Sequence, residues 1–335
     1  MSGKLFDFLS SFGLMIAGVG LTFCFTLSFP ALQRTPVFVF PESGPSQMVV
    51  NSGPKELPKS QPVFPVAKNT EPYTATLTAY AAVVLDERTG RTLYEKNALE
   101  QRPLASMTKL MSALVLLDLS PSWTATATVT EADNDTSSHI VNVGETYHLS
   151  DLWLAALVGS SNSAVRTLIR SLGVSQEEFV ARMNDKARRL GLSSLLFVDP
   201  TGLNSGNIGG AMDAARLLSV AIKKEKIADA LRRPEITLRP LNKKDTHRIW
   251  STNWLLTNWI PNDFDKTKMA GKTGFINDAR YNVVVRLVGG SGRPIIAAVL
   301  GSETNESRFE EARDLAKWVF RHYLWPGDEG YPAGE

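Results

Sequence analysis

The chain has 335 residues, 43% of them hydrophobic, and can therefore bury a large core in one or two domains. Its 36 basic and 34 acidic residues leave a net charge of +2, and no basic run or aromatic patch indicates a nucleic-acid partner. The single cysteine excludes an internal disulfide framework and the four histidines lack the spacing of metal ligands, so we expect chemistry with no metal and no cofactor.

The first predicted element is a membrane anchor or uncleaved signal at residues 8–33, after a short N-terminal segment of residues 1–7. Residues 8–33 carry no charged side chain and are long enough to cross a bilayer as a helix. A cleaved signal peptide would have a shorter apolar core and a small-residue cleavage site, and neither is clear here. Cys24 follows Phe23 rather than the small residue of a lipoprotein signal, so we interpret it as a membrane-buried apolar residue.

A proline- and serine-rich stretch at residues 34–77 comes next and predicts a flexible linker. About 40 extended residues at about 3 Å each would carry a domain on the order of 100 Å from the membrane. The prolines of this stretch include Pro41, Pro45, Pro54, Pro58, Pro62 and Pro65.

Residues 78–325 form the predicted globular domain, and residues 326–335 form a short tail. Two strands, a helical block, three strands and a final helix indicate an α+β fold, in which both ends of the chain build one antiparallel sheet that helices cover. In chain order the predicted elements are a hairpin of 81–85 and 91–94, a helical block from 104 to 224, strands at 268–274, 281–288 and 295–300, and a helix at 306–324.

The first candidate motif is Ser-x-x-Lys, formed by Ser106 and Lys109 at the start of a helical pattern over residues 105–119. Residues three apart share one face of a helix, so the hydroxyl and the amine can meet near its N-terminal end. Ser52 and Lys55 have the same spacing, but the intervening Pro54 removes that geometry.

A serine hydroxyl is a weak nucleophile until a base takes its proton, and Lys109 is the candidate base. Burial, a nearby second cation such as Lys272 and the positive end of the helix would each favour the neutral amine. The alternative is that Lys109 only extends its charge to solvent from one side of the helix.

The second motif is Ser160-Ser161-Asn162, at the junction of helical patterns at 151–158 and 163–169. Ser160 could pass a proton between Lys109 and a leaving amine, while Asn162 could hold Lys109 and donate to a substrate carbonyl. The alternative is that these polar residues cap the following helix. Two further matches to Ser-x-Asn lie in turn-rich or unassigned segments, Ser205-Gly206-Asn207 and Ser251-Thr252-Asn253.

The third motif is Lys272-Thr273-Gly274, at the end of the predicted strand 268–274. Thr273 can bind a substrate carboxylate or amide, and Gly274 lets a substrate backbone approach the strand. The backbone N–H groups of Phe275 and Ser106 are candidates for an oxyanion hole. The alternative is an ordinary charged strand terminus with a turn glycine.

Taken together, the three motifs resemble those of the penicillin-recognising serine peptidases of the D-alanyl-D-alanine carboxypeptidase and endopeptidase type. This resemblance implies an α/β (α+β) fold like that of β-lactamases and transpeptidases, with a five-stranded antiparallel sheet flanked by helices and a helical subdomain. It also implies a bacterial periplasmic enzyme that acts on peptidoglycan stem peptides through a Ser106 acyl-enzyme and is captured covalently by β-lactams. Further segments that carry the resemblance are Leu85-Asp86, Thr89-Gly90, Arg102 to Ala105, Asp199 to Leu203, and Ala279 to Val283.

Two departures from the family pattern favour an endopeptidase that cuts D-Ala cross-bridges. Carboxypeptidases of the family typically continue into a second, all-β domain, whereas this chain stops about ten residues after its last predicted helix. They also usually have an arginine after the glycines of the last strand, where this chain has Gly301-Ser302-Glu303. The N-terminal anchor with a long linker differs from the cleaved signal of many relatives and implies attachment to the inner membrane.

Three alternatives remain at this stage. The first is a D-alanyl-D-alanine carboxypeptidase that trims terminal D-Ala. The second is a class A β-lactamase, which is disfavoured because no Glu-x-x-Leu-Asn segment is present to activate a deacylating water. The third is a non-hydrolytic cell-wall-binding or division scaffold, which covalent labelling by a penicillin would distinguish from an enzyme.

Overall fold

A five-stranded antiparallel sheet is the centre of the protein, whose computed structural model describes residues 64–69, 71–135 and 139–332. The strand order is β10-β11-β12-β2-β3, so strands from both ends of the domain lie side by side, as predicted. The strands are β2 (Ala81–Asp86), β3 (Thr92–Lys96), β10 (Ala270–Ile276), β11 (Arg280–Val288) and β12 (Pro294–Ser302).

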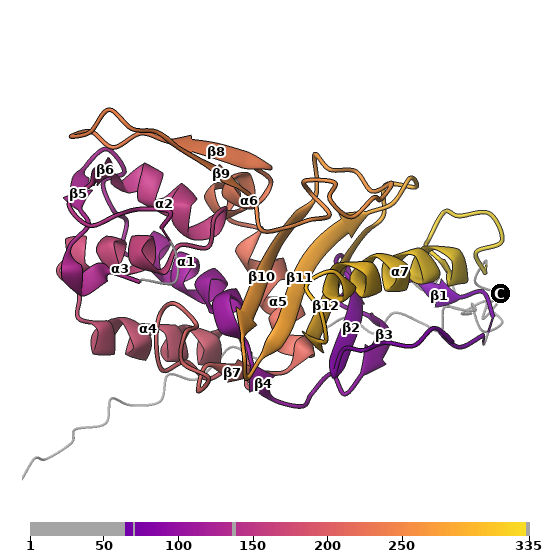
Figure 1. Cartoon of the computed structure of the whole chain (residues 1–335). Helices are drawn as coiled ribbons and strands as arrows, with labels where there is room; N and C mark the ends of the chain where they lie inside the picture. Colours follow the sequence, from indigo (N-terminus) through magenta and orange to yellow (C-terminus); the bar gives the residue numbers. More distant parts are fainter. Residues whose placement is uncertain (1–63, 70, 136–138, 333–335) are drawn as a thin grey trace, which may run out of the picture. The chain divides into compact units, whose positions relative to one another are not determined.

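The two faces of the sheet are both buried, because alternate side chains point to opposite sides and each side carries a helix. Helix α7 (Ser307–His322) covers the face that includes Val283 and Val299. Helix α5 (Ala211–Ala221) covers the face that includes Val284 and Ala298, as the central part of Figure 1 shows. Strand β10 is therefore left at one edge of the sheet, with its pairing partner β11 on one side only.

A group of helices packs beside this edge strand and forms the helical subdomain (Figure 1). Its first helix, α1, follows a single 3-10 turn, η1, and contacts α2, α3, α4 and α5. The helical elements are η1 (Ala105–Thr108), α1 (Lys109–Asp118), η2 (Glu131–Asp133), α2 (Leu149–Leu157), α3 (Asn162–Ser171), α4 (Gln176–Arg189) and α6 (Glu225–Leu231).

Helices dominate residues 104–224, as predicted, but short strands that the sequence pattern did not predict lie between them. In the pair β5–β6, the first strand has the sequence Thr-Ala-Thr. Its two β-branched threonines fit a pleated strand better than a helix. A hairpin that the sequence analysis left unassigned, β8–β9, follows α6. The short strands are β4 (Arg102–Pro103) with β7 (Ile208–Gly209), β5 (Thr126–Thr128) with β6 (Thr146–His148), and β8 (Glu235–Leu238) with β9 (His247–Trp250).

The last part of the expected linker belongs to the folded domain. Strand β1 (Val66–Ala67) pairs with β13 (Tyr323–Leu324), and the Tyr73 ring packs edge-on against Trp318. Apolar and aromatic side chains in this stretch outweigh its prolines, because they can be buried against the sheet and α7. The start of the expected tail is also fixed, since Asp328 forms an ion pair with Arg293.

The predicted anchor at residues 8–33 and most of the predicted linker lie outside the described residues. Among the residues that the structure describes, no helix has both the length and the apolar character needed to cross a membrane.

Candidate active site

The candidate nucleophile, Ser106, lies in the 3-10 turn that precedes α1. The α-helix itself begins at Lys109, four residues later than the sequence pattern predicted. Ala105 has a left-handed backbone with φ +49°, which is rare for a residue with a Cβ and typical of functional sites. Gly202 packs directly against this turn: a Cβ at Gly202 would lie 2.0 Å from the Ala105 carbonyl oxygen, so only glycine fits.

The Lys109 amine lies at the centre of the site and is 1% exposed. Its Nζ donates to Ser106 Oγ at 2.8 Å, to Asn162 Oδ1 at 2.6 Å and to the Thr201 carbonyl oxygen at 2.8 Å. The structure thus brings Ser106, Lys109 and Asn162 together, and the alternative, in which Lys109 only extends its charge to solvent, is wrong.

Burial lowers the pKa of Lys109 to about 7 because the charged amine loses its water. The carboxylates of Asp199 and Asp135 act in the opposite direction and raise this pKa, while the guanidinium of Arg166 lowers it further. An amine with a pKa near 7 is largely available as a base at neutral pH.

Ser160 and Asn162 lie at the junction of α2 and α3, as predicted, and their side chains contact different lysines. Ser160 has a left-handed backbone with φ +65°, and its Oγ accepts a hydrogen bond from Lys272 Nζ at 2.8 Å. Asn162 contacts Lys109. The capping role falls to the residue between them, because Ser161 Oγ accepts from the Ala164 N–H at 3.2 Å.

Lys272 lies within β10 rather than at its end, because the strand continues to Ile276. Burial lowers the pKa of Lys272 well below its ordinary value, and the positive charges of Lys109 and Arg308 act in the same direction. The expected second cation near Lys109 is therefore present, and the repulsion between the two amines disfavours a charge on both.

Gly274 is the point at which β10 touches the nucleophile turn. A Cβ at Gly274 would lie 2.5 Å from the Leu104 carbonyl oxygen and 3.1 Å from the Ser106 nitrogen. Phe275 is the next residue of β10. Its half-exposed ring stacks on the Tyr281 ring, with 4.4 Å between the ring centroids. The contacts with the nucleophile turn bring the Ser106 N–H close to Gly274, which directly precedes Phe275, the other residue whose N–H is predicted for an oxyanion hole.

Several residues of the site were not assigned to it from the sequence. Thr252 accepts a hydrogen bond from Thr273 Oγ1 at 2.7 Å and belongs to a further Ser-x-Asn match, Ser251-Thr252-Asn253. Arg308, at the start of α7, is buried and donates to the carbonyl oxygens of Gly274 and Asn282. The Ser-x-Asn match around Thr252 was a sequence signal for that residue. Arg308 had none, because a single arginine on a helix forms no motif.

The loop that supplies the Thr201 carbonyl is organised by Asp199. One oxygen of Asp199 accepts from the Thr201 and Gly202 N–H groups, and the other accepts from the Asn204 N–H. Asn207, which is completely buried, donates to the Asp199 carbonyl and to Thr108 Oγ1 beneath the nucleophile turn. The Asp199-to-Leu203 segment therefore holds the base and the turn in a fixed relation.

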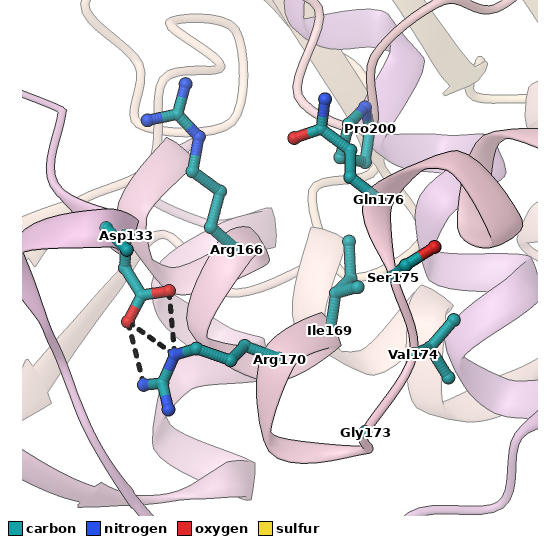
Figure 2. A pocket seen from close by; sticks show the side chains of 10 residues that line it. Asp133, Arg166, Ile169, Arg170, Gly173, Val174, Ser175, Gln176 and Pro200 are labelled. Atoms are coloured by element: carbon teal, nitrogen blue, oxygen red, sulfur yellow. Dashed lines mark hydrogen bonds and ion pairs between the residues drawn. The ribbon is translucent and has the colours of Figure 1, made fainter.

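An open pocket of about 490 Å³ adjoins the site on the side of α3 and α4. Figure 2 shows Arg166, Ile169 and Arg170 along α3, with Gln176 and Pro200 opposite and Asp133 paired to Arg170. Pro200 directly precedes Thr201, so the pocket and the site share a wall. Among the described residues, no group of His, Cys, Asp and Glu side chains could hold a metal ion.

The profile of the D-alanyl-D-alanine carboxypeptidase family matches residues 67–304, which include every residue of this site except Arg308. The chain belongs to this family. This confirms the predicted membership of the penicillin-recognising serine peptidases, and with it the serine-hydrolase class.

Two curated relatives of this family member have different printed activities. A D-alanyl-D-alanine endopeptidase of Pseudomonas aeruginosa is 30% identical over 76% of this chain and 81% of its own length. A D-alanyl-D-alanine carboxypeptidase of Bacillus subtilis, DacF, is 29% identical over 73% of this chain, and the match spans 63% of that protein.

Among solved structures, the D-alanyl-D-alanine carboxypeptidase of Mycobacterium tuberculosis superposes with a TM-score of 0.67 and 26% identity. The superposition covers 78% of this chain and 97% of that one. The predicted β-lactamase and transpeptidase-like fold is confirmed.

Proposed function

We propose that this protein is a serine DD-peptidase that hydrolyses D-Ala cross-bridges between peptidoglycan stem peptides through an acyl-enzyme on Ser106. The observation that supports this proposal most is the set of three contacts of the Lys109 amine. A neutral amine has two hydrogens and one lone pair. The Asn162 and Thr201 oxygens can only accept, so they take the two hydrogens, and the lone pair is directed at the Ser106 hydroxyl.

In the proposed acylation, Ser106 Oγ attacks the carbonyl carbon of the D-Ala residue as Lys109 takes the hydroxyl proton. The negative charge that develops on the carbonyl oxygen is stabilised by the backbone N–H groups of Ser106 and Phe275. The amide bond then breaks, the D-Ala carbonyl remains as an ester on Ser106, and the leaving amine needs one proton.

We assign proton delivery to Lys109 with Ser160 as the intermediate group. Ser160 Oγ accepts a hydrogen bond from Lys272 Nζ, and this contact makes the Ser160 hydroxyl a better proton donor. Thr273 and the free edge of β10 bind the substrate backbone as an added strand, and Gly274 leaves room for it. Water hydrolyses the ester in the second half of the reaction, with Lys109 again as the base.

The endopeptidase reaction is favoured over the carboxypeptidase reaction by two observations. Endopeptidases of Pseudomonas aeruginosa and Haemophilus influenzae are 30% and 32% identical to the chain, and the carboxypeptidases DacF and DacB2 are 29% identical. The position expected for the carboxylate-binding arginine is occupied by Gly301-Ser302-Glu303. The test is digestion of isolated cross-linked and uncross-linked wall peptides followed by mass analysis. Cleavage of dimers supports the endopeptidase, and loss of only terminal D-Ala identifies a carboxypeptidase.

Covalent labelling tests the enzyme itself. A fluorescent penicillin is expected to modify the intact protein and to miss the Ser106→Ala variant, because the ester can form only on that hydroxyl. If the intact, folded protein takes no label, the cell-wall-binding scaffold replaces the peptidase as the better explanation.

We further propose that residues 8–33 anchor the domain at the inner membrane and hold it in the periplasm. The absence of charge over these residues supports the anchor, and the proline-rich stretch after it supports a flexible connection. Fractionation of cells that produce the full chain tests this: recovery in the membrane pellet, with release by detergent but not by high salt, is expected.

A further inference from the structure

We propose that Asp135 is a positioning residue that sets the orientation of the Asn162 amide and thereby directs the lone pair of Lys109 at Ser106. This inference rests on the proposed function and adds a residue to it. Asp135 belongs to none of the three motifs, and it lies between η2 and β6 on a segment with no regular structure.

The contact that carries the inference joins Asp135 Oδ2 to Asn162 Nδ2 at 2.5 Å. A carboxylate only accepts hydrogen bonds, so the amide nitrogen of Asn162 must face Asp135 and the amide oxygen must face Lys109. Both residues are more than nine-tenths buried, so water cannot easily replace this contact. If the amide were reversed, its NH₂ group would point at Lys109 and would compete with Ser106 for the single lone pair of the neutral amine.

The segment that carries Asp135 is held in place by one face of α3. Ser163 Oγ accepts from the Asp135 N–H at 2.9 Å, and Arg166 Nη1 donates to the Asn134 carbonyl oxygen at 2.9 Å. One turn later, Arg170 forms an ion pair with Asp133 at 2.8 Å, which Figure 2 shows. Asn162 lies on the same helix, so the carboxylate and the amide that it orients share one support.

The carboxylate also acts on Lys109 through its charge. Asp135 and Asp199 raise the pKa of Lys109, and Arg166 on α3 lowers it, against the dominant effect of burial. Lys272 on β10 faces the same space and repels a charged Lys109. Removal of the Asp135 charge is therefore expected to lower the pKa of Lys109, because one source of attraction for its proton is lost.

The decisive variant is Asp135→Asn, which keeps the size of the side chain but removes its charge and its acceptor-only character. We expect the maximal rate constant of acylation by a fluorescent penicillin to fall at least about tenfold, because the Asn162 amide is no longer fixed. We also expect the acid limb of the rate–pH profile, the part in which the rate falls as Lys109 becomes protonated, to move to lower pH. A residue with a merely structural role would leave that limb in place.

Asp133→Asn is the matched control, since it removes a buried carboxylate two residues earlier whose partners are Arg170 and Thr130. It is expected to lower the unfolding temperature and to leave the acid limb unchanged. The proposal is overturned if Asp135→Asn keeps the wild-type rate and limb, or if Asp133→Asn shifts the limb equally.

Two measurements keep the proposal testable if Asp135→Asn folds poorly. Asp135→Glu keeps the charge but moves it by one methylene group, so the rate should fall while the acid limb stays near that of the wild type; an unchanged rate overturns the proposal. The second combines Asp135→Glu with Asn162→Ala, a background in which the further effect of Asp135→Glu on the maximal rate should vanish. A full effect in that background means that Asp135 does not act through Asn162.

The failure of this inference can be told apart from the failure of the proposed function. If the wild type is labelled and Asp135→Asn behaves like it, only the positioning role is lost. If the wild type is not labelled, the pKa of Lys109 can still be read from the ¹³C shift of its Cε against pH. An unchanged pKa in Asp135→Asn then overturns the inference on its own.

Discussion

Lys272 Nζ donates a hydrogen bond to Ser160 Oγ at 2.8 Å, and this contact joins two motifs that are 112 residues apart. One residue comes from the edge strand of the sheet and the other from the junction between α2 and α3. The contact therefore closes the site between the sheet and the helical subdomain. The two lysines of the site have different partners, since Lys109 contacts the nucleophile Ser106 and Lys272 contacts the hydroxyl of Ser160.

Replacement of Lys272 is expected to weaken binding more than chemistry. Lys272→Ala should raise the concentration of β-lactam needed for half-maximal labelling by about 10- to 100-fold, which corresponds to the loss of one charged hydrogen bond. The limiting acylation rate should change less. Stopped-flow labelling over a range of penicillin concentrations separates the two quantities, and a fall in the limiting rate alone would contradict the assignment.

Replacement of Lys109 is expected to abolish acylation. Lys109→Ala removes the base and leaves the hydroxyl protonated, so the acylation rate should drop by at least about 10³-fold. The variant also leaves the Asn162 and Thr201 oxygens without their donor, so circular dichroism has to show that it is folded. Normal acylation by Lys109→Ala would show that another group takes the proton.

The pH dependence of acylation follows from the same amine. Only neutral Lys109 can accept the Ser106 proton, and its pKa is about 7. The rate should therefore be fully developed above pH 7 and should fall about tenfold for each pH unit below it. Measurement of the penicillin labelling rate between pH 5 and pH 9 at about constant ionic strength checks this, with circular dichroism to show that the protein stays folded. A flat profile across pH 7 would exclude Lys109 as the titrating base.

Gly202 is expected to be intolerant of a side chain. Gly202→Ala combines a left-handed backbone at φ +91° with a Cβ that would lie 2.0 Å from the Ala105 carbonyl oxygen. Each effect is worth about 1–3 kcal/mol, so a loss of about 2–5 kcal/mol in the free energy of unfolding is expected.

Two other glycines serve as controls for Gly202. Gly173→Ala has a comparable φ of +69° with nothing within 4 Å of the added Cβ, and Gly290→Ala has open space without a left-handed backbone. Urea unfolding should rank Gly202→Ala as the most harmful, then Gly173→Ala, then Gly290→Ala. Equal effects at Gly202 and Gly173 would mean that the nucleophile turn adjusts to the added methyl group.

The short elements were predicted less well than the long ones, for physical reasons. The strands of the sheet and α7 bury long apolar patterns, which one segment of sequence displays by itself. Strand β1 has only two residues, and its formation depends on β13, more than 250 residues away. The sequence pattern predicts an α-helix from Ala105, because Met107 continues the apolar spacing, but residues 105–108 form a 3-10 turn whose left-handed Ala105 packs against Gly202.

The sequence by itself determined the three motifs, the α+β class and the sheet built from both chain ends, because spacing and periodicity along the chain carry that information. Only the tertiary structure decided that Lys272 contacts Ser160, and that Thr252, Arg308 and Asp135 belong to the site. These residues act through single contacts between distant segments, and such contacts leave no periodic signal. The direction of the lone pair on Lys109 shows this most clearly. It is set by two acceptors, Asn162 Oδ1 on α3 and the Thr201 carbonyl oxygen in a loop, which come together only around the buried amine.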